Sequence, residues 1–178
     1  MKLVILALLP ITLAAASPSQ YGSQPSLGSK HDAAEIVQKY VSVLQQKEYN
    51  GKKPSETAEE IIAPNYQDFS DSVHSTLKQE LNGQPLSRDR TQFLENVATN
   101  SKKSPPPFAQ LESTNVLCAE DNVIFWSWRL AAVGSGKYPV KGTQLFYLDD
   151  HGQIYKSEFE FNSLAWGADT GQVNAYCG

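Results

Sequence analysis

Hydrophobic positions in the first part of the chain recur with the spacing of an amphipathic helix. Between residues 32 and 48 the apolar side chains follow one another at intervals of one, three and four positions and therefore share one helical face. These side chains are Ile36, Val37, Tyr40, Val41 and Leu44. Asp32 followed by Glu35 resembles a capping box at the start, and Gly51 is a stop signal. The pattern predicts a helix over residues 32–48.

Two further helices are predicted before the pattern changes. Acidic side chains fill the early turns after Ser55, where the helix dipole favours them. Pro64 ends this short helix, because the residue before a proline avoids the α conformation. A third helix is predicted over residues 88–99, with Ser87 as its N-terminal cap. Between the second and third helices, residues 65–73 predict a short strand or an irregular crossing.

After residue 107 the apolar period becomes two, which is typical of strands. Four strands are predicted, over residues 108–118, 123–133, 143–149 and 154–163. Helices first and strands last indicate an α+β domain, in which three N-terminal helices pack on one face of a curved, mainly antiparallel sheet.

The N-terminus has the three parts of a secretory signal peptide: Lys2, an apolar stretch over residues 3–13, and small residues up to Ala16. A bilayer span needs roughly 20 apolar residues, so no membrane association is expected. The alternative, a buried N-terminal helix, is disfavoured because no polar face interrupts the stretch. We expect a secreted, extracellular protein. Its expected parts are a signal peptide, a flexible segment, a folded domain and a C-terminal tail, at residues 1–16, 17–30, 31–166 and 167–178.

Charge and motifs exclude several classes of partner. The chain has 15 basic and 19 acidic residues, a net charge of -4, without clusters of basic residues. Nucleic acid is therefore not an expected partner. No metal, nucleotide or phosphate motif is present, so we expect no cofactor.

The two cysteines, Cys118 and Cys177, are predicted to form a disulfide that tethers the C-terminal tail, because paired thiols are usually oxidised outside the cell. Two free thiols or a metal site are the alternatives. A zinc site is disfavoured because no histidine pair lies near the cysteines.

The order of these elements resembles the nuclear transport factor 2-like superfamily, and the resemblance covers residues 32–166. It looks closest to secreted fungal members. The segments that carry it are DAAEIVQKYVSVLQQKEY, ETAEEIIAPNYQDFSD, NVIFWSWRL and GTQLFYLDDHGQIYKSEFEF. The resemblance implies a cone, in which a strongly bent sheet wraps one long helix and the open end forms a pocket. Some members are polyketide cyclases, dehydratases or isomerases, others bind ligands or proteins, and many dimerise through the outer sheet face.

Two titratable residues near the exit of the second helix are candidate catalytic groups. The resemblance implies that Asp68 points into the pocket as a proton acceptor, and burial beside Tyr66 and Phe69 would raise its pKa. His74 is the histidine nearest the expected pocket mouth. The competing interpretation of Asp68 is a turn residue that binds its own backbone. Against a catalytic His74, the second inward histidine of dehydratase-like members is missing.

Aromatic side chains on the strands are candidate pocket residues. Trp126 and Trp128 share a face by alternation, and that face forms either core or pocket wall. Tyr147 lies on a strand that is apolar on both faces, which indicates that both faces are covered. Glu158 is expected to face solvent, although the opposite register would bring it into the cone. The candidate pocket residues are Tyr66, Phe69, Trp126, Trp128, Tyr147 and Glu158.

Three functional hypotheses follow. The favoured one is a non-catalytic domain that binds a small hydrophobic molecule or a partner protein in or around a conical pocket. The second is a cofactor-independent lyase, isomerase or cyclase that uses Asp68 and His74. The third is an extracellular interaction factor, or homodimer, acting through the outer sheet face. The enzyme hypothesis requires that Asp68 and His74 reach a common point in a cavity.

Overall fold

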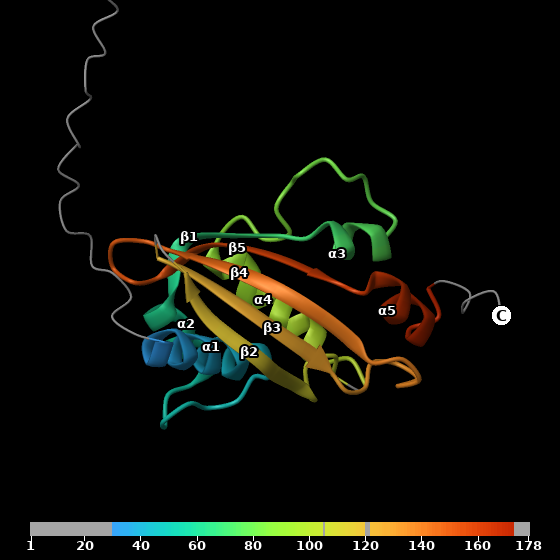
Figure 1. The fold of residues 1–178 in the computed structure, drawn as a ribbon, viewed down its shortest axis with the longest axis horizontal. Coiled ribbons are helices and arrows are strands. Elements are labelled where there is room, and N and C mark those ends of the chain that lie inside the picture. The colour runs from blue at the N-terminus through green and yellow to red at the C-terminus, as the bar shows by residue number, and fades with distance from the viewer. Residues whose placement is uncertain (1–29, 105, 120–121, 173–178) are drawn as a thin grey trace, which may run out of the picture.

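One curved, five-stranded sheet organises the part of the chain that the computed structural model describes, residues 30–104, 106–119 and 122–172 (Figure 1). The strand order is β1-β5-β4-β3-β2. The strands are β1 (Ile62–Phe69), β2 (Leu111–Ala119), β3 (Val123–Leu130), β4 (Val140–Leu148) and β5 (Ile154–Phe161). The last four form the predicted antiparallel meander, and β1 pairs with β5 in parallel.

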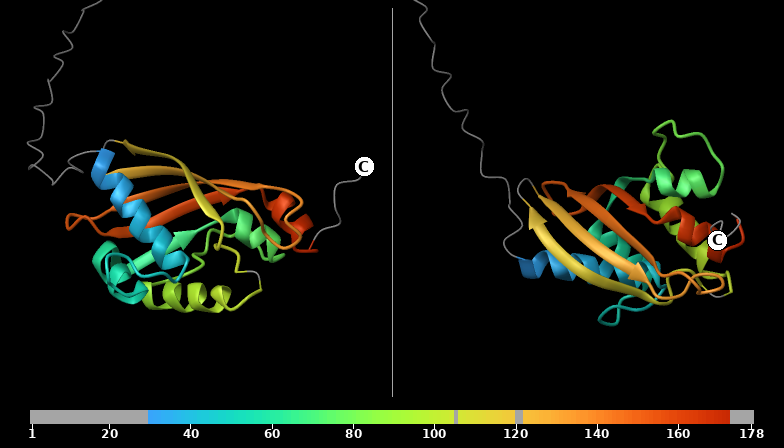
Figure 2. Two further views of the ribbon diagram at one scale, coloured as in Figure 1. Left: turned by 90° about the horizontal axis from the view of Figure 1, so that it is seen from below. Right: turned by 45° about the vertical axis from the view of Figure 1, so that its right-hand side comes forward.

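Helices cover one face of this sheet, as the α+β prediction requires. They are α1 (Lys30–Leu44), α2 (Pro54–Ile61), α3 (Asp71–Thr76), α4 (Arg90–Ser101) and α5 (Ser163–Asp169). Figure 2 shows α1, α2 and α4 on the same side of the sheet. The short helices α3 and α5 lie next to each other at one end of the sheet (Figure 1).

The predicted elements are confirmed, with shifted boundaries. The first helix ends at Leu44 because its apolar face ends there, and Gln46 turns the chain with a φ of 54°. The third helix is capped by Asp89, whose side chain accepts a hydrogen bond from the Gln92 backbone N–H at 2.8 Å. The prediction that Ser87 caps this helix is wrong. Helices α3 and α5 were not predicted, because six or seven residues are too few to show a helical period.

Alternation along β3 and β4 decides which side chains face the helices. In β3 the inward residues are Ile124, Trp126, Trp128 and Leu130, which confirms that the two tryptophans share a face. Trp126 stacks on Phe146 with ring centroids 6.0 Å apart, and Tyr40 of α1 meets Phe146 edge-on at 4.7 Å. This aromatic layer joins α1 to the sheet.

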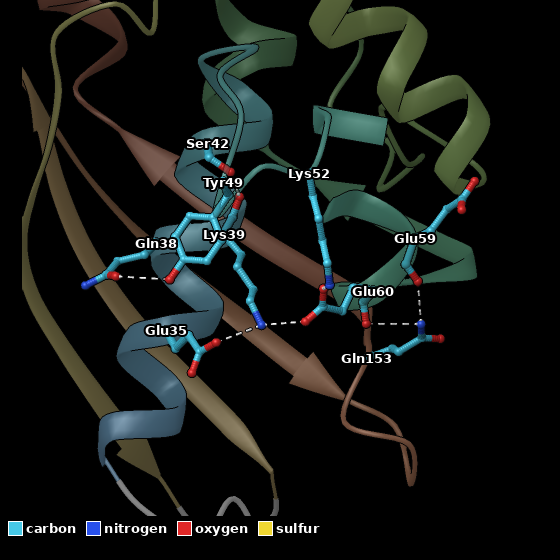
Figure 3. A network of polar contacts seen from close by, with 9 residues as sticks. All are labelled: Glu35, Gln38, Lys39, Ser42, Tyr49, Lys52, Glu59, Glu60 and Gln153. Atoms are coloured by element: carbon cyan, nitrogen blue, oxygen red, sulfur yellow. Dashed lines mark hydrogen bonds and ion pairs between the residues drawn. The ribbon is translucent and has the colours of Figure 1, made fainter. Parts of the chain in front are cut away.

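Polar contacts fix α2 between α1 and the turn that joins β4 to β5 (Figure 3). The Lys39 ammonium contacts the Glu60 carboxylate at 2.6 Å, and Lys52 contacts the same carboxylate at 2.5 Å. These bonds lower the pKa of Glu60. The Gln153 side chain donates to the Glu59 backbone carbonyl at 2.8 Å, which satisfies one free carbonyl at the end of α2. The start of β1 is thereby held in place.

Several sequence expectations fall outside the described residues. The predicted signal peptide and flexible segment lie before residue 30, and Cys177 lies after residue 172. Cys118 lies near the C-terminal end of β2, and its predicted disulfide with Cys177 stays a prediction. None of the helices in the described ranges is long and apolar enough to cross a membrane.

Gly142 is required beneath the Trp128 indole. A Cβ atom at this position would lie 2.3 Å from Cζ2 of Trp128, which is far inside van der Waals contact. We predict that Gly142→Ala destabilises the domain by about 1–3 kcal/mol, the usual cost of overpacking, in urea unfolding. Lys141→Ala, on the exposed neighbour, is the control and should change stability by less than about 0.5 kcal/mol.

A double variant tests whether contact with the Trp128 ring causes this loss of stability. Trp128→Phe removes the ring atoms that would meet the new Cβ, so the double variant Gly142→Ala/Trp128→Phe should be more stable than the sum of the single effects predicts. Additive effects would contradict this assignment.

Candidate functional site

A cavity of about 520 Å³ lies between the helices and the concave face of the sheet. Its wall is mostly apolar and rich in aromatic rings. The aromatic lining residues are Tyr40, Phe93, Phe108, Trp126, Trp128, Phe159, Phe161 and Trp166. The volume is in the range of pockets that bind small organic molecules.

Asp68 is the carboxyl group in the wall of this cavity. It shares the inward face of β1 with Tyr66, and only 6% of its surface is exposed. The Asp68 backbone carbonyl accepts from the Leu86 N–H at 2.8 Å, and Asp68 and Ser87 form an isolated antiparallel bridge. The segment that contains Ser87 therefore covers the edge of β1, and Asp68 is not a surface turn residue.

Burial dominates the electrostatics of Asp68. Loss of hydration raises its pKa to about 6, although hydrogen bonds from the Ser87 hydroxyl and backbone act in the opposite direction. Oδ1 of Asp68 is buried and has no hydrogen-bond partner among the described residues. The Asn96 side chain donates to Ser87 Oγ at 3.1 Å, which leaves the Ser87 hydroxyl proton for Asp68. Asp68 is thus held in place while one oxygen remains unsatisfied.

A chain of buried hydroxyl groups lies beside Asp68. The Tyr66 hydroxyl lies 2.7 Å from Ser157 Oγ and 3.2 Å from the Tyr40 hydroxyl, which accepts from the Gln144 side chain at 3.3 Å. Burial, together with the nearby Asp68 charge, raises the pKa of both tyrosines. Both phenols therefore stay protonated at neutral pH. Tyr66 belongs to this network behind the wall and is not among the cavity-lining residues.

His74 lines the same cavity, but its ring nitrogens already have protein partners. Nε2 donates to the Gln84 backbone carbonyl at 3.0 Å, and Nδ1 lies 2.8 Å from Oε1 of Gln79. The Gln79 backbone N–H also donates to the His74 carbonyl at 2.9 Å. The imidazole therefore fastens the loop after α3, and neither nitrogen is open to a ligand.

Glu160 fixes the helix that carries His74. Its carboxylate accepts from the backbone N–H groups of Asp71 and Ser72, both at 2.8 Å, and from the Ser72 hydroxyl. These are the free N–H groups at the start of α3, where a negative charge is favoured. Glu160 thus anchors α3 to β5.

Three predicted pocket residues lie on the opposite, outer face of the sheet. Phe69 and Glu158 line a second hollow of about 530 Å³ there, and the Tyr147 hydroxyl donates to Glu158 at 2.8 Å. The prediction that Phe69, Tyr147 and Glu158 line the cone cavity is therefore wrong. The expectation that Glu158 points away from the cone is confirmed, and its carboxylate pairs with Lys156 at 2.6 Å. The charges of Lys156 and Glu158 in the outer hollow are thus already paired.

The cavity also contains polar residues that were not predicted. Gln144 lies among Val140, Phe146 and Leu148 on the buried face of β4, and a polar residue at an apolar position was a usable signal. Ser87 and Asn96 lie in a loop and on α4, where no sequence pattern relates them to Asp68. Within the described ranges, no group of three or more metal-ligating side chains is present.

Comparison with solved structures places this geometry in a known fold. A steroid delta-isomerase from Pseudomonas aeruginosa is 13% identical, with a TM-score of 0.52 over 84% of this chain and 94% of that chain. A phenazine biosynthesis-related protein from the same organism is 15% identical, with a TM-score of 0.53 over 90% and 94%. A SnoaL-like family protein from Agrobacterium tumefaciens is 16% identical, with a TM-score of 0.51 over 73% and 97%. At these identities the likeness concerns the fold alone.

The sequence itself identifies the family. No protein with a curated description matches the chain. The family model described as NTF2-like domain matches residues 27–173, which include all the described strands and helices. The chain therefore belongs to the NTF2-like domain family.

Proposed function

We propose that this domain binds a small, mainly apolar molecule in the cone cavity and holds a polar group of that molecule against Asp68. The observation that carries the proposal is a buried carboxyl oxygen without a partner in the wall of an aromatic cavity. An unpaired buried acceptor is costly, and a ligand hydroxyl or N–H group would satisfy it. The aromatic wall would supply affinity through apolar contact.

The outer face of the sheet supports the competing interaction hypothesis less well. In its hollow, Lys156 pairs with Glu158 and Glu160 binds the start of α3, while Asp71 is a further acidic residue of the lining. None of the buried unsatisfied side-chain atoms of the described residues belongs to this hollow. The cone cavity is therefore the preferred site.

Proton-transfer catalysis is a second candidate function, favoured by the pKa of Asp68. A carboxyl group with a pKa of about 6 is ionised at neutral pH and more basic than an ordinary aspartate, as a general base requires. This catalysis would rest on Asp68 alone, because both ring nitrogens of His74 are occupied. The likeness to isomerases in fold permits this function without selecting it.

Binding can be tested with two matched fluorescent molecules. We predict that 2-naphthol, which can donate a hydrogen bond to Asp68, binds more tightly at pH 7.5 than 2-methoxynaphthalene, which cannot. Asp68→Asn should reduce the affinity for 2-naphthol by about tenfold, because a charge-assisted bond becomes a neutral one, and should leave 2-methoxynaphthalene unchanged. Glu158→Gln on the outer face is the control and should change neither titration. Absence of saturable binding of both compounds would refute the proposed function.

The buried charge of Asp68 predicts a specific pH dependence of stability. The folded pKa of about 6 lies above the ordinary value of 3.8, so the native state holds this proton more tightly than the unfolded state. The contribution of Asp68 to the free energy of unfolding is fully present below pH 4 and is lost as the pH rises through 6. The loss amounts to about 3 kcal/mol. Between pH 4 and 7, Asp68→Asn should gain about this much relative to the unsubstituted protein in urea unfolding. A difference that does not vary with pH would show that Asp68 is not desolvated.

Catalysis can be tested with 5-nitrobenzisoxazole, an apolar aromatic molecule. When a base removes its C3 proton, the ring N–O bond breaks and a coloured cyanophenolate forms. We predict turnover that rises with an apparent pKa of about 6 and is lost in Asp68→Asn but kept in Glu158→Gln. Equal rates in the Asp68→Asn variant would contradict the catalytic role and leave binding as the function.

A further inference from the structure

The chain contains two Asn-Gly pairs, Asn50-Gly51 and Asn82-Gly83, and both are exposed on the surface. In such a pair the backbone nitrogen of the glycine can attack the asparagine side-chain amide, because glycine places no Cβ atom beside that nitrogen. The attack closes a five-membered ring within the chain, so proximity replaces an enzyme. The folded backbone around each pair therefore decides which asparagine reacts.

Asn50-Gly51 is held in a two-residue hairpin turn. Tyr49 and Lys52 exchange two backbone hydrogen bonds, both of 3.0 Å, and the φ angles of Asn50 and Gly51 are 50° and 79°. Two positive φ angles define a type I′ turn. In this turn the ψ angle of the first central residue is about 30°, which turns the glycine nitrogen away from the asparagine Cβ. Ring closure at Asn50 therefore requires the hairpin to open.

Asn82-Gly83 lies in the loop that joins α3 to α4, residues 77–89, and is not held in this way. Among the described residues, no backbone-to-backbone hydrogen bond involves Asn82 or Gly83. The Gln84 backbone N–H donates to Oδ1 of Asn82 at 3.2 Å, which polarises the amide carbon that the glycine nitrogen attacks. A Cβ atom built on Gly83 would meet nothing within 4 Å, so the surroundings are open. The ring can thus close at Asn82 without breaking a backbone hydrogen bond.

We propose that Asn82 is a site of spontaneous deamidation and isoaspartate formation in the folded protein. The Gly83 nitrogen gives up its proton and bonds to Cγ of Asn82, while the Cγ–Nδ2 bond breaks and ammonia leaves with that proton. Water then opens the cyclic imide. Cleavage between the nitrogen and Cγ gives aspartate. Cleavage between the nitrogen and the original main-chain carbonyl carbon gives isoaspartate, in which the main chain runs through Cβ and Cγ. Either product carries a new carboxylate.

The modification alters a loop that contributes to the wall of the cone cavity. Nε2 of His74 donates to the Gln84 carbonyl at 3.0 Å, two residues after the reacting asparagine. Pro85 and Leu86 follow directly and line the cavity. An isoaspartate at position 82 adds one methylene group to the main chain, so the hydrogen bond from His74 no longer fits the loop. Conversion of Asn82 therefore loosens the loop, whatever ligand the cavity binds.

The two pairs can be compared within one molecule by mass spectrometry. After the protein has aged in mildly alkaline buffer, trypsin releases residues 48–52 and 79–88 as separate peptides, each with one Asn-Gly pair. We expect Asn82 to convert about tenfold faster than Asn50, because the hairpin has to give up two backbone hydrogen bonds before it reacts. In urea-unfolded protein the two rates should agree. Labelling with an isoaspartate-specific methyltransferase should mark the peptide of residues 79–88.

Matched variants test the assignment and its effect on the loop. Asn82→Gln needs a six-membered ring, which closes far more slowly, and should abolish conversion in residues 79–88, whereas Asn50→Gln should leave it unchanged. Hydrogen exchange in residues 79–88 should become faster as the unsubstituted protein ages, but not in Asn82→Gln. Conversion of Asn82 that is no faster than that of Asn50 in the folded protein would overturn the site. Unchanged exchange after Asn82 has converted would overturn the loosening of the loop.

Discussion

The packing of aromatic rings between α1, α4 and the concave side of the sheet is the constraint on which the rest depends. Tyr40 of α1 contacts Phe93 of α4 as well as Trp126 and Phe146 of the strands. These rings hold the helices against the sheet, and those of Tyr40, Phe93 and Trp126 also form the floor of the cavity. Aromatic side chains are large and bury much apolar surface, so this layer contributes strongly to the core as well as to the cavity wall.

Some polar groups beside this floor have hydrogen-bond partners in the protein, and others do not. The hydroxyls of Tyr40, Tyr66 and Ser157 satisfy one another, and Ser87 holds Asp68. The Asp68 oxygen and the Trp128 N–H have no such partner among the described residues. Structural hydrogen bonds therefore preorganise the wall, and the proposed function assigns the unsatisfied Asp68 oxygen to a ligand.

His74 and Glu160 are titratable residues whose role is to hold backbone segments in place. His74 fastens the loop after α3, and Glu160 fastens the start of α3 itself. His74 lines the cavity but has no open ring nitrogen for a ligand, and Glu160 lies on the outer face of the sheet. A histidine close to a pocket is thus explained by the loop that it holds, and Asp68 is the remaining candidate for an acid–base group.

The sequence by itself determined the α+β class, the meander and the shared face of Trp126 and Trp128, because periods of 3.6 and two reflect backbone geometry directly. It also pointed to Asp68. Tyr147 was misplaced because its strand carries large apolar side chains on both faces, so alternation could not say which face is concave. Only the tertiary structure brought Ser87 and Asn96 to Asp68 and left Trp128 over Gly142 without an acceptor. Those relations join residues far apart in the chain, and they depend on the curvature of the sheet, which no local pattern encodes.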